Sequence, residues 1–214
     1  MDLYLDSADR EALGPLLRTG VFAGVTTNPL ILERAGVRLG EVPELTRWLL
    51  DAGAREVFLQ TTTSDVEAVV AEGHALRALS DRVVVKVPAT VAGLTATAEL
   101  ARAGVPTLLT AVYHVRQAVL ARAVGAAWIA PYLGRMTEAG RDGRRHVEQM
   151  QGILTGSGTR VLVASIRSVD DVHRLAVAGI DAVTVSAAVA RELLEEPLTA
   201  AAVDQFDEAV TRLR

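Results

Sequence analysis

The sequence of 214 residues contains no cysteine, so neither disulfide bonds nor a thiolate metal site can form. Its histidines are scattered along the chain without the close spacing that zinc ligands show: His74, His114, His146 and His173. The first predicted loop holds no G-x-G-x-x-G motif, so nothing supports a dinucleotide site. We therefore expect a protein that binds no metal and needs no cofactor.

Long apolar runs and clusters of basic residues are missing too. No segment is long and apolar enough to predict a membrane span, and no basic start precedes an apolar run as in a secretory signal. The net charge is −4, and the stripe of Lys and Arg that a nucleic-acid surface needs is not visible. These absences favour a soluble cytoplasmic protein with no nucleic-acid or membrane partner.

Lysine occurs once, at Lys86, whereas arginine occurs 21 times. Lys86 lies in the run VVVKVP of residues 83–88, whose β-branched side chains predict a buried strand. A lysine in a strand can simply protect an exposed sheet edge, but arginine would serve that purpose equally well. Arginine cannot supply a neutral amine nucleophile, and lysine can. The use of lysine at this single position therefore predicts a catalytic nucleophile.

Short apolar runs alternate along the chain with longer segments of helical periodicity. The strand candidates are Leu3–Leu5, Gly24–Thr26, Glu56–Gln60, Val83–Val87, Thr107–Thr110, Trp128–Tyr132, Arg160–Ser165 and Ala182–Val185. Eight strand–helix alternations in a chain of this length predict an α/β fold, a closed (β/α)8 TIM barrel, with an open doubly wound sheet as the alternative. No low-complexity linker divides the chain, so residues 1–214 are expected to form a single domain.

Helix ends and two longer segments complete this organisation. Helix C-caps are expected at glycines that come just before a strand: Gly104, Gly125 and Gly179. Residues 133–145 form the longest polar stretch and are expected to be a loop after the sixth strand. Residues 198–214 predict an additional C-terminal helix, because their apolar residues fall at helical spacing. That helix either covers its own barrel or docks on a neighbouring subunit.

Polar residues end seven successive predicted strands. They are Asp6, Thr26 with Asn28, Gln60, Lys86, Thr110, Tyr132 and Ser165. The C-terminal ends of barrel strands converge on one mouth, where functional residues of this fold lie. Each residue alone has a structural explanation: Asp6 as a helix cap, Asn28 as part of a turn, Tyr132 as a core ring with a bonded tip. Their coincidence with Lys86 favours one shared site.

Several motifs resemble those of the transaldolase family, in order and over essentially the whole chain. They are LYLDSADREAL from residue 3, GVFAGVTTNPLIL from residue 20, VVVKVPATVAGLTA from residue 83, PTLLTAVYHVRQA from residue 106, WIAPYLGRM from residue 128 and VLVASIR from residue 161. The resemblance implies a Schiff base on Lys86, a (β/α)8 barrel, and sugar or sugar-phosphate substrates. The short chain is similar to the compact subfamilies, which implies a homo-oligomer (pentamer or decamer) whose C-terminal helix packs on a neighbour.

The resemblance also implies roles for the other residues at the strand ends. Asp6, Thr26 and Asn28 would surround the lysine and hold substrate hydroxyl groups, and Asp6 would also take part in catalysis by shuttling protons. Gln60, Thr110 and Tyr132 would position a water molecule through which the tyrosine acts as general acid and base. A phosphate site is implied at Arg135, Ser165 and Arg167, where an arginine fork suits a pair of phosphate oxygens. The structural alternative for both arginines is an ordinary salt bridge.

Two of these positions separate the activities within the family. Transaldolases typically carry Glu and Phe where this chain has Gln60 and Tyr132, and the pair found here is similar to fructose-6-phosphate aldolases. The resemblance thus implies a lyase that cleaves fructose 6-phosphate to dihydroxyacetone and glyceraldehyde 3-phosphate. The alternative is a transaldolase of the pentose phosphate pathway. Three other classes also compete: a zinc-dependent aldolase, a barrel isomerase, and a non-catalytic barrel that only binds phosphosugars.

Overall fold

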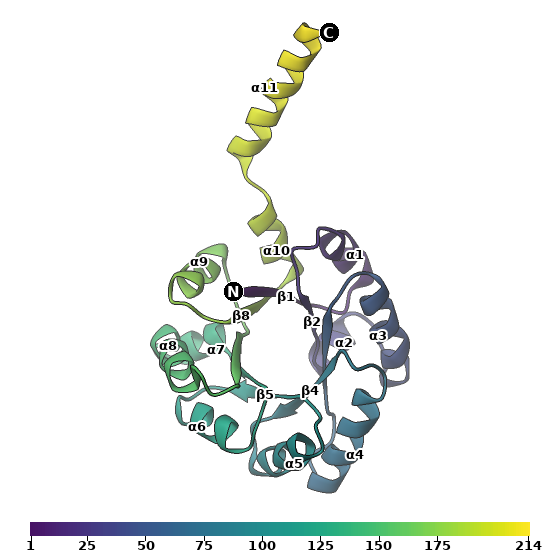
Figure 1. The fold of residues 1–214 in the computed structure, drawn as a ribbon, viewed down its shortest axis with the longest axis vertical. Helices are drawn as coiled ribbons and strands as arrows, with labels where there is room; N and C mark the ends of the chain where they lie inside the picture. The colour runs from purple at the N-terminus through teal and green to yellow at the C-terminus, as the bar shows by residue number, and fades with distance from the viewer.

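A computed structural model describes all 214 residues and shows eight parallel strands closed into one barrel (Figure 1). The strands are β1 (Asp2–Asp6), β2 (Gly24–Thr26), β3 (Glu56–Gln60), β4 (Val83–Pro88), β5 (Thr107–Val112), β6 (Trp128–Pro131), β7 (Arg160–Val163) and β8 (Ala182–Val185). β1 pairs with β8, which closes the ring. The predicted (β/α)8 barrel is therefore confirmed, and the open sheet is wrong.

Helices follow the strands and surround the barrel (Figure 1). They are α1 (Arg10–Arg18), α2 (Pro29–Arg34), α3 (Val42–Asp51) preceded by the short 3₁₀ helix η1 (Leu39–Glu41), α4 (Val66–Arg77), α5 (Val91–Arg102), α6 (Arg116–Ala123), α7 (Leu133–Glu138), α8 (Gly143–Leu154), α9 (Val169–Val177), α10 (Ala187–Leu194) and α11 (Pro197–Leu213). Side chains such as Asp9 and Ser168 cap their N-termini by accepting bonds from free backbone N–H groups. The predicted C-cap glycines Gly104, Gly125 and Gly179 all have positive φ.

Two apolar layers lie on opposite sides of the strands. The larger cluster packs between strands and helices, with side chains such as Leu5, Leu109 and Ile129 fully buried. The smaller one fills the barrel interior, where the rings of Tyr4, Phe58 and Trp128 meet edge to face. This apolar plug closes the barrel below the C-terminal ends of the strands.

The alternation of side chains along the strands places a layer of polar residues directly above this plug. Successive side chains of a strand point to opposite faces, so residues two positions apart share a face. Within the plug lie Tyr4, Phe58, Val84, Leu108, Ala130 and Ala182. Two residues further along these strands come Asp6, Gln60, Lys86, Thr110, Tyr132 and Thr184. The next inward layer, at the C-terminal mouth, is therefore polar.

The prediction of a loop at residues 133–145 is wrong. Residues 133–138 form helix α7, and α8 already begins at Gly143. Leu133 and Met136 are buried at helical spacing, and Asp142 caps α8 by accepting a bond from the backbone N–H of Arg145 at 3.1 Å. The exposed arginines and the glycines of this stretch made its short apolar face hard to recognise from the sequence.

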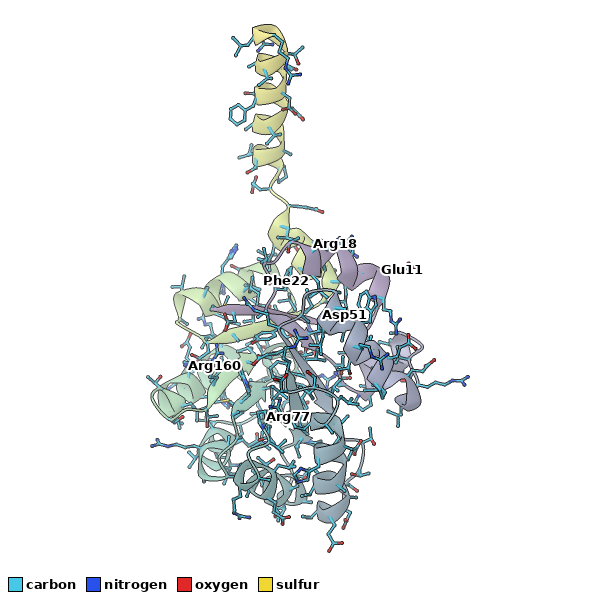
Figure 2. The ribbon with its side chains drawn as sticks, turned by 45° about the vertical axis from the view of Figure 1, so that its right-hand side comes forward. Glu11, Arg18, Phe22, Asp51, Arg77 and Arg160 are labelled. Atoms are coloured by element: carbon cyan, nitrogen blue, oxygen red, sulfur yellow. The ribbon has the colours of Figure 1, made fainter.

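The C-terminal helix forms as predicted but does not cover its own barrel. Helix α11 projects away from the barrel as a separate rod in both views (Figures 1 and 2). None of its residues is buried, and Phe206 stays 65% exposed. Its apolar stripe thus lies open to solvent in this chain. No helix of the protein is both long and apolar enough for a transmembrane segment.

Candidate active site

A cavity of about 190 Å³ opens at the C-terminal mouth of the barrel. Nine of the ten predicted site residues line it: Asp6, Thr26, Asn28, Lys86, Thr110, Tyr132, Arg135, Ser165 and Arg167. They come from six of the eight strands or the segments directly after them, because parallel barrel strands all end at the same mouth. The cavity is large enough for a small ligand and carries both charged and hydroxyl groups.

Lys86 lies at the inner end of the cavity on β4. Its side chain is only 4% exposed, and Nζ donates a hydrogen bond to the carbonyl oxygen of Thr27 at 2.5 Å. Burial lowers the pKa of Lys86 below the ordinary 10.5, and the nearby Asp6 carboxylate raises it in part. A buried lysine with a depressed pKa supplies more neutral amine at neutral pH than an exposed lysine does.

The groups around this amine are fixed by the backbone of neighbouring strands. Thr27 is held to the next strand, since its N–H and its hydroxyl both donate to the carbonyl oxygen of Phe58, at 3.0 and 3.1 Å. On the other side the N–H of Thr61 donates to the carbonyl oxygen of Lys86 at 3.0 Å. The position of the amine is therefore set by β2, β3 and β4 together.

A short chain of hydroxyl groups holds the only carboxylate that lines the cavity. Thr26 Oγ1 donates to Asp6 Oδ1 at 2.6 Å and lies 2.7 Å from the hydroxyl of Thr184. Asp6 does not cap α1, because Asp9 does so. The carboxylate is thus oriented toward the cavity, with Oδ2 left for another donor.

Tyr132 and Thr110 form the second polar pair of the cavity. Their hydroxyl groups lie 2.9 Å apart, and either one can donate. Burial raises the pKa of Tyr132 above its usual range, so the phenol is protonated at neutral pH. A protonated phenol beside a hydroxyl can hold and polarise a water molecule.

The cavity mouth carries the two predicted phosphate arginines. The backbone N–H of Arg135 donates to Ser165 Oγ at 3.3 Å. Arg167 donates from Nε and Nη2 to Glu138 Oε1, at 2.9 and 2.8 Å, with both side chains more than half exposed. The salt bridge considered as the structural alternative therefore exists for Arg167. An exposed pair contributes only about 0–1 kcal/mol, so a phosphate can displace Glu138 at little cost.

Two predicted residues lie differently from the rest. Gln60 is the Cα partner of Lys86 between β3 and β4, but it does not line the cavity and its side chain makes no hydrogen bond. Asn28 lines the cavity, yet its Oδ1 accepts the N–H of Ile31 at 3.0 Å as the cap of α2. The turn explanation thus holds for this oxygen, and the amide nitrogen remains for a ligand.

A family model described as transaldolase/fructose-6-phosphate aldolase matches residues 3–214. The chain belongs to this family. Membership of this family supports an enzyme of the aldolase or transaldolase type.

Curated relatives of this family member extend over nearly its whole length. It is 35% identical over 96% of the chain to a "Probable transaldolase" of Caulobacter sp. (strain K31), of which 94% is covered. It is 33% identical, with the same coverage of both chains, to a "Probable transaldolase" of Aquifex aeolicus (strain VF5). Among solved structures, a mandelate oxidase mutant with a monooxide FMN adduct matches with a TM-score of 0.60 and 20% identity, covering 88% of this chain and 65% of that one. At this identity the likeness shows the barrel fold alone.

Sequence reasoning missed two polar residues that line this transaldolase-family cavity and one that contacts its lining residues. Thr184 shares the inner face of β8 with Ala182, a signal that the alternation of that strand already contained. Arg34 reaches the mouth from the last turn of α2, and no strand-end pattern could find it. Tyr113 contacts the cavity residues Tyr132 and Arg135 from the segment after β5.

Proposed function

We propose that this family member is a class I aldolase that forms a Schiff base on Lys86 and cleaves ketose phosphates, with fructose 6-phosphate as substrate. The observation that carries the proposal is the buried amine: Lys86 is the single lysine of the chain and lies 4% exposed at the inner end of the cavity that the strand-end residues line. An ordinary structural lysine would be charged, exposed and paired, and Lys86 forms no ion pair.

The first steps need a neutral amine and a route for water. The amine of Lys86 adds to the C2 ketone, the carbinolamine oxygen leaves as water, and an iminium ion remains. The carbonyl of Thr27 accepts a bond from Nζ and keeps the amine aimed at one point while it reacts. Burial favours the neutral amine, which the addition requires.

Cleavage then uses the iminium ion as an electron sink. The C4 hydroxyl loses its proton, the C3–C4 bond breaks, its electron pair moves into the iminium group, and glyceraldehyde 3-phosphate leaves. The water held by Tyr132 and Thr110 accepts that proton and later returns one to C3 of the enamine. Hydrolysis of the resulting iminium ion releases dihydroxyacetone and restores Lys86.

The remaining residues select and orient the substrate. Asp6, held by Thr26, accepts bonds from sugar hydroxyl groups, and the amide nitrogen of Asn28 donates to them. Arg135 and Arg167 bind the terminal phosphate through charge-assisted hydrogen bonds. Transfer of the enamine to a second aldehyde, the transaldolase reaction of the pentose phosphate pathway, is the second candidate, and the name "Probable transaldolase" of the relatives supports it.

Reductive trapping tests the proposal directly. Borohydride with dihydroxyacetone or fructose 6-phosphate should add one substrate-derived mass to the intact protein, and peptide mapping should place it on Lys86. The matched control is Lys86→Arg, which keeps the charge but has no amine nucleophile and should give neither adduct nor turnover. The N-terminal amine is the one other site that could react, and mapping separates the two. An unchanged adduct in Lys86→Arg, or none in the wild type, contradicts the proposal and leaves a non-catalytic phosphosugar-binding barrel.

A further inference from the structure

Tyr113 lies between β5 and α6 and closes a triangle with two cavity residues. Its ring meets the ring of Tyr132 edge to face, with centroids 5.5 Å apart and planes at 71°. Its hydroxyl accepts a hydrogen bond from Arg135 Nη1 at 3.4 Å. The third side is a cation–π contact, since Arg135 Cζ lies 5.0 Å from the centroid of the Tyr132 ring. Tyr113 thus touches both the acid–base residue and the phosphate residue of the proposed mechanism.

The backbone of Tyr113 is held firmly in this place. Its N–H donates to Gln117 Oε1 at 2.9 Å, and its carbonyl oxygen accepts a bond from Arg141 Nη1 at 2.6 Å. Two residues earlier Ala111 has a φ of 56°, at a register shift between β5 and β6. A non-glycine residue in this region costs about 1–3 kcal/mol and persists only where surrounding contacts hold it, which is typical of functional sites.

We propose that Tyr113 is a positioning residue that links phosphate binding at Arg135 to the orientation of Tyr132. The inference rests on the proposed function and deepens it, since it names the device that couples recognition of a phosphorylated substrate to proton transfer. Tyr113 itself touches neither reacting atoms nor phosphate in this scheme. It acts by holding the two residues that do.

The two contacts of Tyr113 can be separated chemically. The hydroxyl group restrains the Arg135 guanidinium at the cavity mouth, where the phosphate arrives. The ring supports one face of Tyr132, whose hydroxyl must stay within hydrogen-bond reach of Thr110. Loss of the hydroxyl should therefore affect the binding of phosphate, whereas loss of the ring should affect proton transfer for every substrate.

Two variants of Tyr113 test this separation. Tyr113→Phe keeps the ring and should raise KM for fructose 6-phosphate about 2- to 5-fold more than KM for non-phosphorylated fructose, because one long hydrogen bond is lost. Tyr113→Leu removes the ring and should lower kcat about 10-fold or more for both substrates, because small displacements of a catalytic group are costly. The control is Tyr4→Phe, which makes the same chemical change in the barrel plug, where Tyr4 donates to Glu56 at 2.8 Å. It should lower Tm without changing the ratio of the two KM values.

The outcomes distinguish this inference from the proposed function. If both Tyr113 variants behave like Tyr4→Phe, or if Phe and Leu have the same effect on KM and kcat, the linking role is wrong. Borohydride trapping is measured on the same proteins. If the Lys86 adduct forms in all of these proteins but Tyr113→Phe and Tyr113→Leu do not differ in their effects on KM and kcat, only the role proposed for Tyr113 is wrong. When the wild type forms no adduct, the proposed function itself fails.

Discussion

Replacement of Gly93 by alanine should reduce activity far more than its distance in sequence from Lys86 suggests. Gly93 lies in the first turn of α5, directly after the strand that carries Lys86. A Cβ atom at this position would lie 1.9 Å from the carbonyl oxygen of Pro88 and 3.1 Å from Val87 Cγ1. An ordinary contact begins at 3.4 Å, so strand and helix must separate by about 1.5 Å.

The size of the effect follows from what moves with Pro88. This residue is two positions after Lys86 and is the Cα partner of Thr110 across the β4–β5 pair. A displacement of about 1 Å in a catalytic group can cost about 100-fold in rate, so kcat should fall by about 100-fold. Alanine gains up to about 1 kcal/mol of helix propensity over glycine, but an overpacked contact costs about 1–3 kcal/mol. The clashing atom is a backbone oxygen, which cannot move aside as a flexible side chain can. We therefore expect the overpacking cost to exceed the gain in helix propensity, so the free energy of unfolding should fall.

Gly152→Ala is the matched control, since Gly152 also lies inside a helix but its Cβ would meet no atom within 4 Å. This variant should gain about 0.5–1 kcal/mol of stability and keep wild-type turnover. Urea unfolding and steady-state kinetics on the three proteins provide the measurement. If Gly93→Ala retains kcat within about 2-fold of the wild type, the geometric reasoning that links Pro88 to Lys86 is refuted.

Three further predictions concern phosphate, reaction type and assembly. Replacement of Arg135 or Arg167 by Ala should lower kcat/KM for phosphorylated substrates by the equivalent of about 1–3 kcal/mol, with a much smaller loss for non-phosphorylated aldehydes. Equal losses in kcat/KM for both kinds of substrate would show that the arginines are structural. Tyr132→Phe should slow the cleavage of fructose 6-phosphate more than the transfer of its dihydroxyacetone unit, and adding Gln60→Glu should favour transfer further. If the wild type releases glyceraldehyde 3-phosphate only when erythrose 4-phosphate is present, the enzyme is a transferase. Light scattering should report a homo-oligomer of five or ten subunits that is lost after deletion of residues 198–214, and a wild-type monomer would contradict this.

The barrel could be predicted because its sequence signals are local and repeated. Each strand is a short β-branched or apolar run, and a longer helical pattern separates it from the next. The polar mouth followed from the same alternation, since strand ends converge in a closed parallel sheet. Lys86 stood out because no other lysine competes with it.

The parts that could not be predicted depend on backbone geometry and on space. The position of Tyr113 depends on the left-handed backbone of Ala111 and on the register shift between β5 and β6. No residue pattern in the sequence predicts either feature. Helix α7 is too short for a clear periodicity, and its buried side is only Leu133, Gly134 and Met136. Gly134 approaches its neighbours closely, since a Cβ there would lie 2.5 Å from the carbonyl oxygen of Ser165. Such contacts exist only once the chain has folded.

The depressed pKa of Lys86 leads to the last prediction. With no second lysine in the chain, burial is the main cause of the depression, and the Asp6 carboxylate opposes it by stabilising the charged amine. Asp6→Asn should therefore lower the pKa of Lys86 further, so the neutral amine should persist to lower pH. The rate of borohydride trapping plotted against pH should move to lower pH, while turnover falls because the hydroxyl-binding carboxylate is lost. Asp2→Asn, at the other end of the barrel in an ion pair with Arg160, should leave the profile in place. A profile that stays fixed or moves to higher pH in Asp6→Asn would show that Asp6 does not stabilise the charged amine.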